Sequence, residues 1–97
     1  MLVHIVCWKY KAETDETARV DHRSRLKRLV GVIPEIQSFE VGEDILRLER
    51  SFDTGLTSTF ADRDALDRYT AHPEHQKVAA LGKDIAERVV SVDFLTD

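Results

Sequence analysis

The chain has 97 residues, a net charge of -4, 42% hydrophobic residues and 33% charged residues. This length predicts one domain over residues 1–97, which alone hides only roughly two-thirds of the surface of the unfolded chain. The balanced composition excludes disorder, and the short apolar runs exclude a membrane span. The negative charge argues against nucleic acid as a partner. We expect a cytoplasmic protein, because no basic leader precedes the first apolar run and the single Cys7 rules out an internal disulfide.

Residues 2–10 are rich in β-branched and aromatic side chains, which favours a strand. A strand has a side-chain period of two, so it presents two different apolar faces. One face carries His4, Val6, Trp8 and Tyr10, and the other carries Val3, Ile5, Cys7 and Lys9. We assign the first face to the helices, so the second face needs a separate cover.

An amphipathic helix follows, which Thr14 or Asp15 caps and Pro34 ends. Its inward positions recur at helical spacing: Ala18, His22, Leu26, Leu29, Val30 and Ile33. The opposite face carries four basic residues that we interpret as solvated: Arg19, Arg23, Lys27 and Arg28.

The middle of the chain predicts a β-hairpin. Residues 36–50 alternate as one long strand, in which residues 42–44 supply a bulge or bend, or alternatively a tight turn. A second extended run over residues 52–60 follows after a short connection. The two runs therefore pair as an antiparallel hairpin.

The last third predicts two helices and a strand. Asp62 caps a short helix with Ala65, Leu66 and Tyr69 inward. Pro73 begins a longer helix, which we expect to run to about residue 88. Its inward positions are Val78, Leu81, Ile85 and Val89. Residues 90–95 form the last strand.

The order β-α-β-β-α-β is that of the ferredoxin-like α+β fold, a four-stranded antiparallel sheet with its helices on one face. The other face, which includes Val3, Ile5 and Cys7, stays bare within the chain. An exposed apolar sheet needs a partner. We therefore expect a homodimer through the sheet face opposite the helices, with two sheets packed face to face.

Three segments carry a resemblance to a known family. They are residues 4–6, residues 34–42, and residues 60–75, where Phe60 precedes an acidic-capped helix that ends in Tyr69-x-x-His72-Pro73-x-His75. In these segments the chain resembles the stress-responsive α/β-barrel (Dabb) domain family, and the resemblance covers nearly the whole chain. It implies a dimeric α/β barrel of ferredoxin-like subunits, in a family with many members of unassigned activity.

The resemblance also implies a site. One enzyme type in the family closes a linear polyketide by an aldol-type step, without metal or cofactor, using a histidine and a tyrosine that resemble His75 and Tyr69. His4 matches a further pocket histidine. At the position where that enzyme type has a third pocket histidine, this chain has Thr54. A threonine cannot titrate near neutrality, and this difference argues against the same reaction.

The position of His75 in the sequence supports chemistry there independently of the family resemblance. It lies in the first turn of the helix that Pro73 begins, where the helix dipole disfavours imidazolium. Neutral His75 can take a proton from carbon beside a carbonyl while Tyr69 donates to the oxygen. The alternative is a solvated or capping histidine. We expect His72 to be the helix cap, and we expect no metal, because His-x-x-His lacks a third ligand.

Three functions remain open from the sequence. The first is binding of a small apolar or aromatic molecule, with Val6, Trp8 and Thr54 joining His4 as contacts, although Trp8 is alternatively a core residue. The second is a cofactor-free enzyme on a carbonyl compound, such as an aldol-type cyclase, an isomerase or a monooxygenase-like protein, with His75 as base. The third is a purely structural stress protein.

Overall fold

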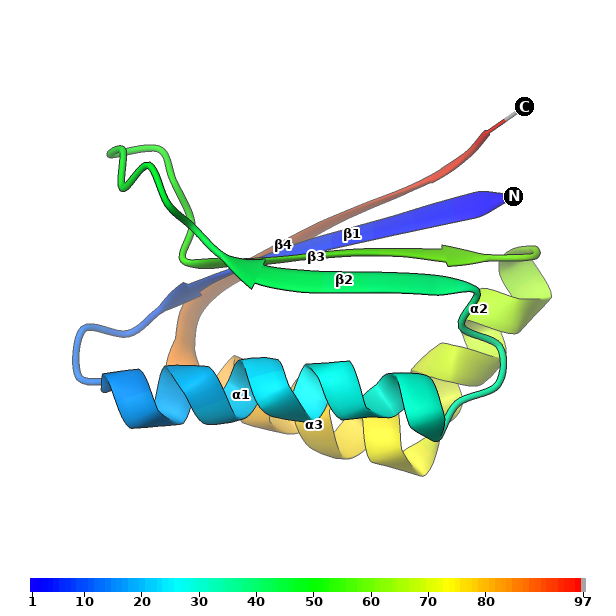
Figure 1. The fold of residues 1–97 in the computed structure, drawn as a ribbon, viewed down its shortest axis with the longest axis horizontal. Helices are drawn as coiled ribbons and strands as arrows, with labels where there is room; N and C mark the ends of the chain where they lie inside the picture. The colour runs from blue at the N-terminus through cyan, green and yellow to red at the C-terminus, as the bar shows by residue number, and fades with distance from the viewer. Residues whose placement is uncertain (97) are drawn as a thin grey trace.

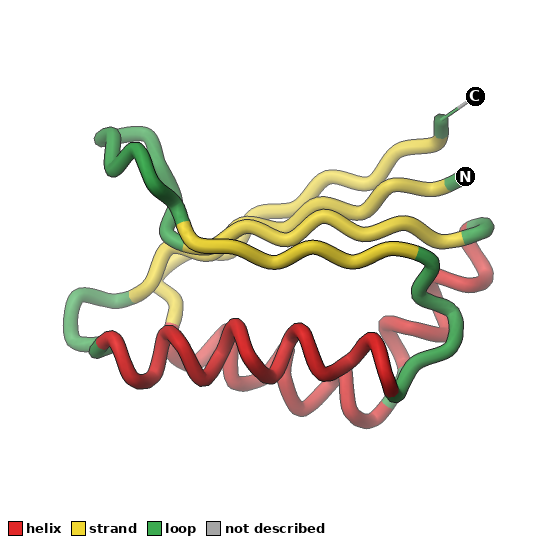
Figure 2. The backbone as a smooth tube through the Cα atoms, in the orientation of Figure 1, coloured by secondary structure: helices red, strands yellow, loops and turns green. Residues whose placement is uncertain are grey.

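The computed structural model describes residues 1–96. Its elements are β1 (Leu2–Tyr10), α1 (Glu16–Arg28), η1 (Leu29–Gly31, a 3-10 turn), β2 (Ser38–Glu43), β3 (Thr54–Phe60), α2 (Arg63–Ala71), α3 (Pro73–Ile85) and β4 (Ala86–Leu95). The strands form one sheet in the order β2-β3-β1-β4, with every neighbouring pair antiparallel. All helices lie on one face of this sheet (Figure 1), and Figure 2 shows the same two layers by element type. The predicted ferredoxin-like fold is confirmed.

The register of the sheet decides which side chains meet the helices. Directly paired residues of antiparallel strands share a face, and in β1 Val6 pairs with Leu56 and Ser91. Trp8 and Tyr10 are buried on this face, as the strand period predicts.

Within residues 1–96, no helix combines the length and the apolar character that crossing a membrane requires.

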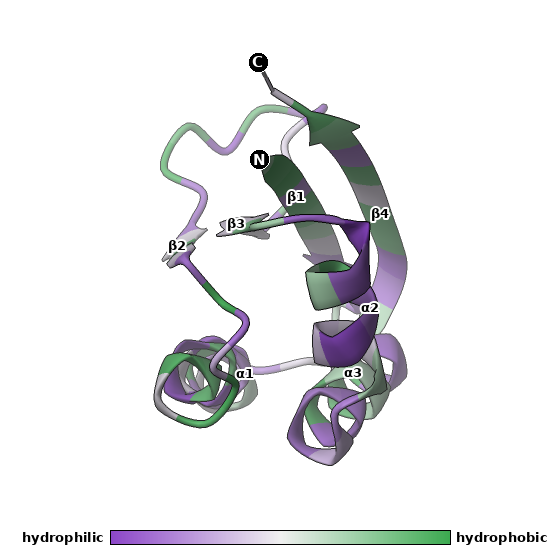
Figure 3. Cartoon of the chain, turned by 90° about the vertical axis from the view of Figure 1, so that its right-hand side faces the viewer, coloured by the Kyte–Doolittle hydropathy of each residue, from purple (hydrophilic) through white to green (hydrophobic). Residues whose placement is uncertain are grey.

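The opposite face of the sheet is open. Figure 3 shows that hydrophobic residues gather on β1 and β4, the half of the sheet farthest from β2. Register places Val90, Val92 and Phe94 of β4 beside Cys7, Ile5 and Val3 of β1, respectively. The three β4 side chains are exposed. Helices cover only the other face, so this apolar strip has no cover from the described chain.

Helix α1 begins as expected but ends differently. The Asp15 carboxylate accepts a hydrogen bond from the Ala18 backbone N–H at 2.9 Å, which makes Asp15 the cap. The last turn tightens into the 3-10 turn η1, with three residues per turn instead of 3.6. This change of period turns Val30 outward, where it is 52% exposed, so its predicted inward position was wrong.

Two of the four basic residues predicted as solvated are partly buried and bound. Arg19 donates from Nε to the Thr14 carbonyl oxygen at 2.8 Å, and its guanidinium lies 5.1 Å from the centre of the Tyr10 ring. Arg23 donates to Thr54 Oγ1 at 3.2 Å. The prediction failed because a long arginine stem can lie along an apolar surface while its head reaches a partner.

The predicted long strand over residues 36–50 ends at Glu43 instead. Residues 44–53 form a loop, closed by a hydrogen bond of 2.9 Å from the Asp44 N–H to the Asp53 carbonyl oxygen. The Asp44 side chain accepts from the Arg47 N–H at 2.7 Å, and Arg47 has a φ of 55°. This local turn overrides the alternating pattern, and it leaves Ile45 and Leu46 86% and 67% exposed. The antiparallel pairing of β2 with β3 is confirmed.

The two C-terminal helices follow the predicted caps. Asp62 accepts from the Ala65 N–H at 2.9 Å, and His72 caps α3 just before Pro73. However, α3 ends at Ile85 and β4 starts at the next residue. The expected helix to residue 88 was therefore too long, and Val89 lies on β4. A valine favours the strand there because β-branched side chains lose rotamer freedom in helices.

Candidate functional site

A cavity of about 210 Å³ lies between the sheet and the helices. Its walls are mostly apolar, and polar groups gather where α2 meets α3. The lining includes five of the six residues that the sequence placed at the site: His4, Val6, Trp8, Tyr69 and His75. The sixth residue, Thr54, does not line this cavity.

His75 reaches the cavity from the first turn of α3. Its Nδ1 lies 3.0 Å from the Thr70 carbonyl oxygen, so in the neutral ring the Nδ1–H donates to that oxygen. The other nitrogen, Nε2, then carries the lone pair and can accept a proton. Burial lowers the pKa of His75; the Thr70 hydrogen bond opposes this shift, and the nearby His4 and His72 rings add to it. Burial is therefore the largest of these causes of the lowered pKa of His75.

Tyr69 lies beside His75 with its ring buried in the core. The ring centroids of the two residues are 4.4 Å apart, and the Tyr69 ring is 4.9 Å from Phe60 and 6.1 Å from His4. Burial raises the pKa of Tyr69 above its usual value, so its hydroxyl keeps its proton at neutral pH. Opposite shifts in two neighbouring groups suit a base and a hydrogen-bond donor.

His4 is bound by a carboxylate of the last strand. Its Nδ1 donates to Asp93 Oδ1, and the register of β1 and β4 places these two residues directly opposite each other. This contact orients the ring and leaves Nε2 for the cavity that His4 lines.

Thr54 belongs to a separate buried network. Its Oγ1 accepts from the Tyr10 hydroxyl at 2.9 Å and from Arg23 at 3.2 Å. Because the Tyr10 hydrogen is used in this bond, the hydroxyl oxygen accepts from His22 Nδ1–H, at 2.7 Å. The network lies beyond Trp8, whose ring centroid is 5.1 Å from that of His22. Thr54 thus supports the core rather than the cavity.

His22 is completely buried, and its Nε2 has no hydrogen-bond partner in residues 1–96. A Cβ at Gly82 would lie 3.1 Å from this Nε2 and 2.9 Å from Trp8 Nε1, so α3 needs a glycine here to approach α1 closely. Burial lowers the pKa of His22 to about 4, helped by Arg23 and opposed by Asp21. The helical period placed His22 inward but gave no sign of this network.

The histidines do not gather around a metal site. No group of three or more His, Cys, Asp or Glu residues within residues 1–96 is placed to hold a metal ion. His72 Nδ1 instead accepts from the Glu74 backbone N–H at 3.1 Å, which confirms its predicted role as a helix cap.

Sequence reasoning missed two charged residues of this region. Asp93 could have been found by pairing the first and last strands and asking what lies opposite His4. Lys83 lines the cavity from α3, eight residues after His75. A helical stripe drawn through His75 and Ala79 at a spacing of four leads to it.

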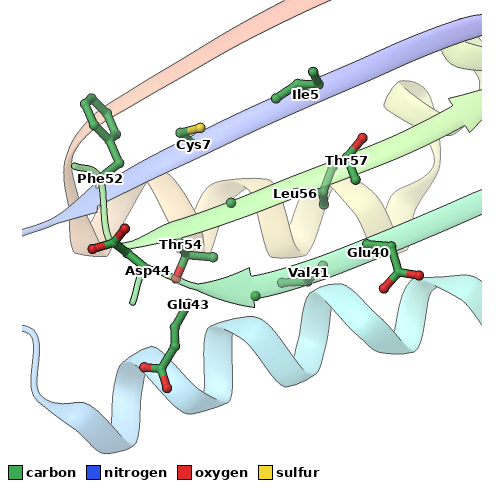
Figure 4. Close-up of a pocket in the computed structure, with 12 residues that line it drawn as sticks. Ile5, Cys7, Glu40, Val41, Glu43, Asp44, Phe52, Thr54, Leu56 and Thr57 are labelled. Carbon is green, nitrogen blue, oxygen red and sulfur yellow. The ribbon is translucent and has the colours of Figure 1, made fainter. Parts of the chain in front are cut away.

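A larger hollow of about 640 Å³ lies on the open face of the sheet, where Asp44 and Phe52 from the two ends of the loop over residues 44–53 line it (Figure 4). Ile5 and Cys7 project into it, and Gly42 and Gly55, which pair across β2 and β3, leave part of its floor without side chains. No histidine or tyrosine lines it. It therefore lacks the proton-transfer groups of the first cavity.

The fold and the first cavity define a class of small ferredoxin-like α+β domains with a ligand-sized space beneath the sheet. Within that class the chain belongs to the stress-responsive A/B barrel domain family, whose sequence description matches residues 2–96. The resemblance drawn from the Tyr69 to His75 segment is confirmed. The chain is 32% identical over 95 residues to a stress-response A/B barrel domain-containing protein of Arabidopsis thaliana, covering 94% of this chain and 82% of the relative.

Two solved structures show the same fold. A dimeric ferredoxin-like protein of unknown function from Thermobifida fusca superposes with a TM-score of 0.89 at 20% identity, covering 98% of this chain and 90% of that one. A hydroxynitrile lyase from Passiflora edulis also gives a TM-score of 0.89, at 18% identity, covering 99% of this chain and 93% of that one. The shared architecture thus occurs both in an enzyme and in a protein of unknown function.

Proposed function

We propose that this protein binds a small, largely apolar carbonyl compound in the cavity between sheet and helices. The observation that carries the proposal is the position of His75, whose Nδ1 is bound to the Thr70 carbonyl oxygen and whose Nε2 is available, beside the Tyr69 ring in a mostly apolar space. A cavity of ~150 Å³ holds a benzene molecule, so about 210 Å³ suits a substituted ring. A purely structural role gives no reason for an unfilled cavity with convergent polar groups.

Filling the cavity should weaken binding strongly. Ala79 lines it, whereas Ala80 is exposed on the same helix. We expect 4-phenyl-2-butanone to bind the wild type and Ala80→Phe equally in isothermal titration, and Ala79→Phe to bind at least tenfold more weakly. Circular dichroism checks that both variants are folded. Equal binding by Ala79→Phe, or no binding by the wild type, would rule out this cavity as the site for such a ligand.

A second candidate function is proton transfer on the bound carbonyl compound. His75 Nε2 would take a proton from the carbon next to the carbonyl group, and the electron pair of that C–H bond would form the enolate. The Tyr69 hydroxyl would donate a hydrogen bond to the enolate oxygen. Return of the proton to carbon completes the cycle without any co-reactant. The neutral state of both side chains favours this division of roles.

We also propose that two copies associate through the sheet face opposite the helices, which would form a dimeric α/β barrel. The exposed apolar strip on β1 and β4 supports this, and so does the loop over residues 44–53, which rises on the same side of the sheet and carries exposed Ile45 and Leu46 (Figure 1). The structurally similar Thermobifida fusca protein is described as dimeric. A C2 dimer would bury the same strip on both subunits.

A charge on this strip should separate the subunits. Val92 on the open face is 53% exposed and Val20 on α1 is 48% exposed, so both accept lysine without disturbing the core. We expect sedimentation velocity at micromolar concentration to give a dimer for the wild type and Val20→Lys, and a monomer for Val92→Lys. A dimeric Val92→Lys would place the interface elsewhere, and a monomeric wild type would refute the barrel.

A further inference from the structure

Lys83 lines the cavity far from the proton-transfer groups. It follows His75 by eight residues on α3, which corresponds to a rise of about 12 Å along the helix. Val89 and Ser91 of β4 line the cavity as well. Lys83 is exposed overall, and a lysine stem can line an apolar wall while its ammonium group stays in solvent. One end of the cavity therefore carries neutral acid–base groups, and the other carries a positive charge.

The ammonium group of Lys83 has no carboxylate within 4.0 Å in the described part of the chain. Lys77, six residues earlier on the same helix, shows the contrast, since its Nζ lies 3.1 Å from Glu74 Oε1. Asp84, the acidic neighbour of Lys83 in sequence, lines a different surface hollow together with Lys11 and Thr14. The charge of Lys83 is thus available to a ligand.

We infer that the ligand carries a carboxylate, which Lys83 binds, at the end opposite to its carbonyl group. This inference rests on the proposed binding function and specifies its ligand class. The carbonyl lies against Tyr69 and His75, and an apolar body fills the space beside Trp8 and Val78. A lone lysine with its aliphatic stem in the wall selects for charge at one position, whereas the apolar walls select only for shape.

The length of the cavity restricts the ligand further. His75 and Lys83 start about 12 Å apart along the helix, and the Lys83 ammonium group lies on the solvent side of the cavity wall. The carbonyl and carboxylate groups should therefore be separated by a ring and a short chain, as in 3-(4-acetylphenyl)propanoate. Its primary amide has nearly the same shape without the charge and serves as the matched neutral probe.

Isothermal titration of both probes against four proteins tests the inference. We expect the wild type to bind the acid roughly five- to tenfold more tightly than the amide, the range for a charge-assisted contact at a solvent-exposed rim. Lys83→Met should bind both probes with the affinity of the amide, and Lys83→Arg should keep the preference for the acid. Lys77→Met is the control on the same helix and should behave as the wild type.

The outcomes separate this inference from the proposed function. Equal binding of acid and amide by the wild type would overturn the role of Lys83 and leave the cavity as a binding site. The role of Lys83 is likewise overturned if Lys83→Met keeps the preference for the acid, or if Lys77→Met loses it. Binding of neither probe to the wild type would overturn both the ligand class and the cavity as a site for it.

Discussion

Acidification from pH 7 to pH 4 should lower the free energy of unfolding by about 2–3 kcal/mol through His22 alone. The folded protein keeps this buried ring neutral, with a pKa of about 4. In the unfolded chain the same ring titrates near its ordinary value of about 6.5. Between these two values the unfolded state binds the proton and the folded state does not. The contribution is therefore fully present above pH 6.5 and is lost as the pH falls toward 4.

Urea denaturation at a series of pH values measures this loss. His22→Asn removes the titration and keeps a side-chain N–H that can reach the Tyr10 hydroxyl, so its stability should vary less between pH 6.5 and pH 4. The matched control is His72→Asn, because asparagine is also a good helix cap and should preserve the wild-type slope. If wild type and His22→Asn show parallel pH profiles, the buried ring is not the source of the acid sensitivity.

The fold was predictable because its strands and helices have clear periods and local stop signals. The start of each α-helix is marked by contacts within a few residues. The structure places all four of these signals as expected: Asp15, Asp62, His72 and Pro73. The wrong predictions lie where the helical period changes, or where a local turn competes with an alternating strand pattern. Val30 sits where an α-helix tightens to a 3-10 turn, and residues 44–53 alternate like a strand but are held by the Asp44 side chain.

The site was predictable only where a local motif or a strand face carried it. The spacing of Tyr69 and His75 is local, and His4, Val6 and Trp8 share one strand face, so these residues meet at the cavity. Their partners come from across the fold and depend on register. Asp93 reaches His4 only through the pairing of the first and last strands. Thr54 shares the helix-facing side with Trp8, but its hydroxyl accepts hydrogen bonds from Tyr10 and Arg23. The side-chain period of a strand gives no sign of these contacts.

Replacing His75 should remove proton exchange from a bound ketone. In deuterated water, the wild type is expected to exchange the protons next to the carbonyl of 4-phenyl-2-butanone faster than buffer does. Proton NMR follows the loss of these signals. His75→Ala should lower the protein-dependent rate at least a hundredfold, within the range of general-base catalysis. Tyr69→Phe should also lower the rate, by roughly ten- to a hundredfold, because the enolate oxygen then lacks its donor.

The pH profile separates a base from a group that only shapes the cavity. Burial holds the pKa of His75 below its ordinary value, so the ring is unprotonated at pH 7 and the rate should be flat there. It should fall in acid only once His75 binds a proton, and the residual rate of His75→Ala should not share this inflection. The cap variant His72→Asn should keep the rate at pH 7 and show the same inflection at a slightly higher pH, because one neighbouring ring that lowers the pKa of His75 is lost. Full exchange activity in His75→Ala would remove His75 as the base, while unchanged ketone binding in the same variant would leave the cavity as a binding site.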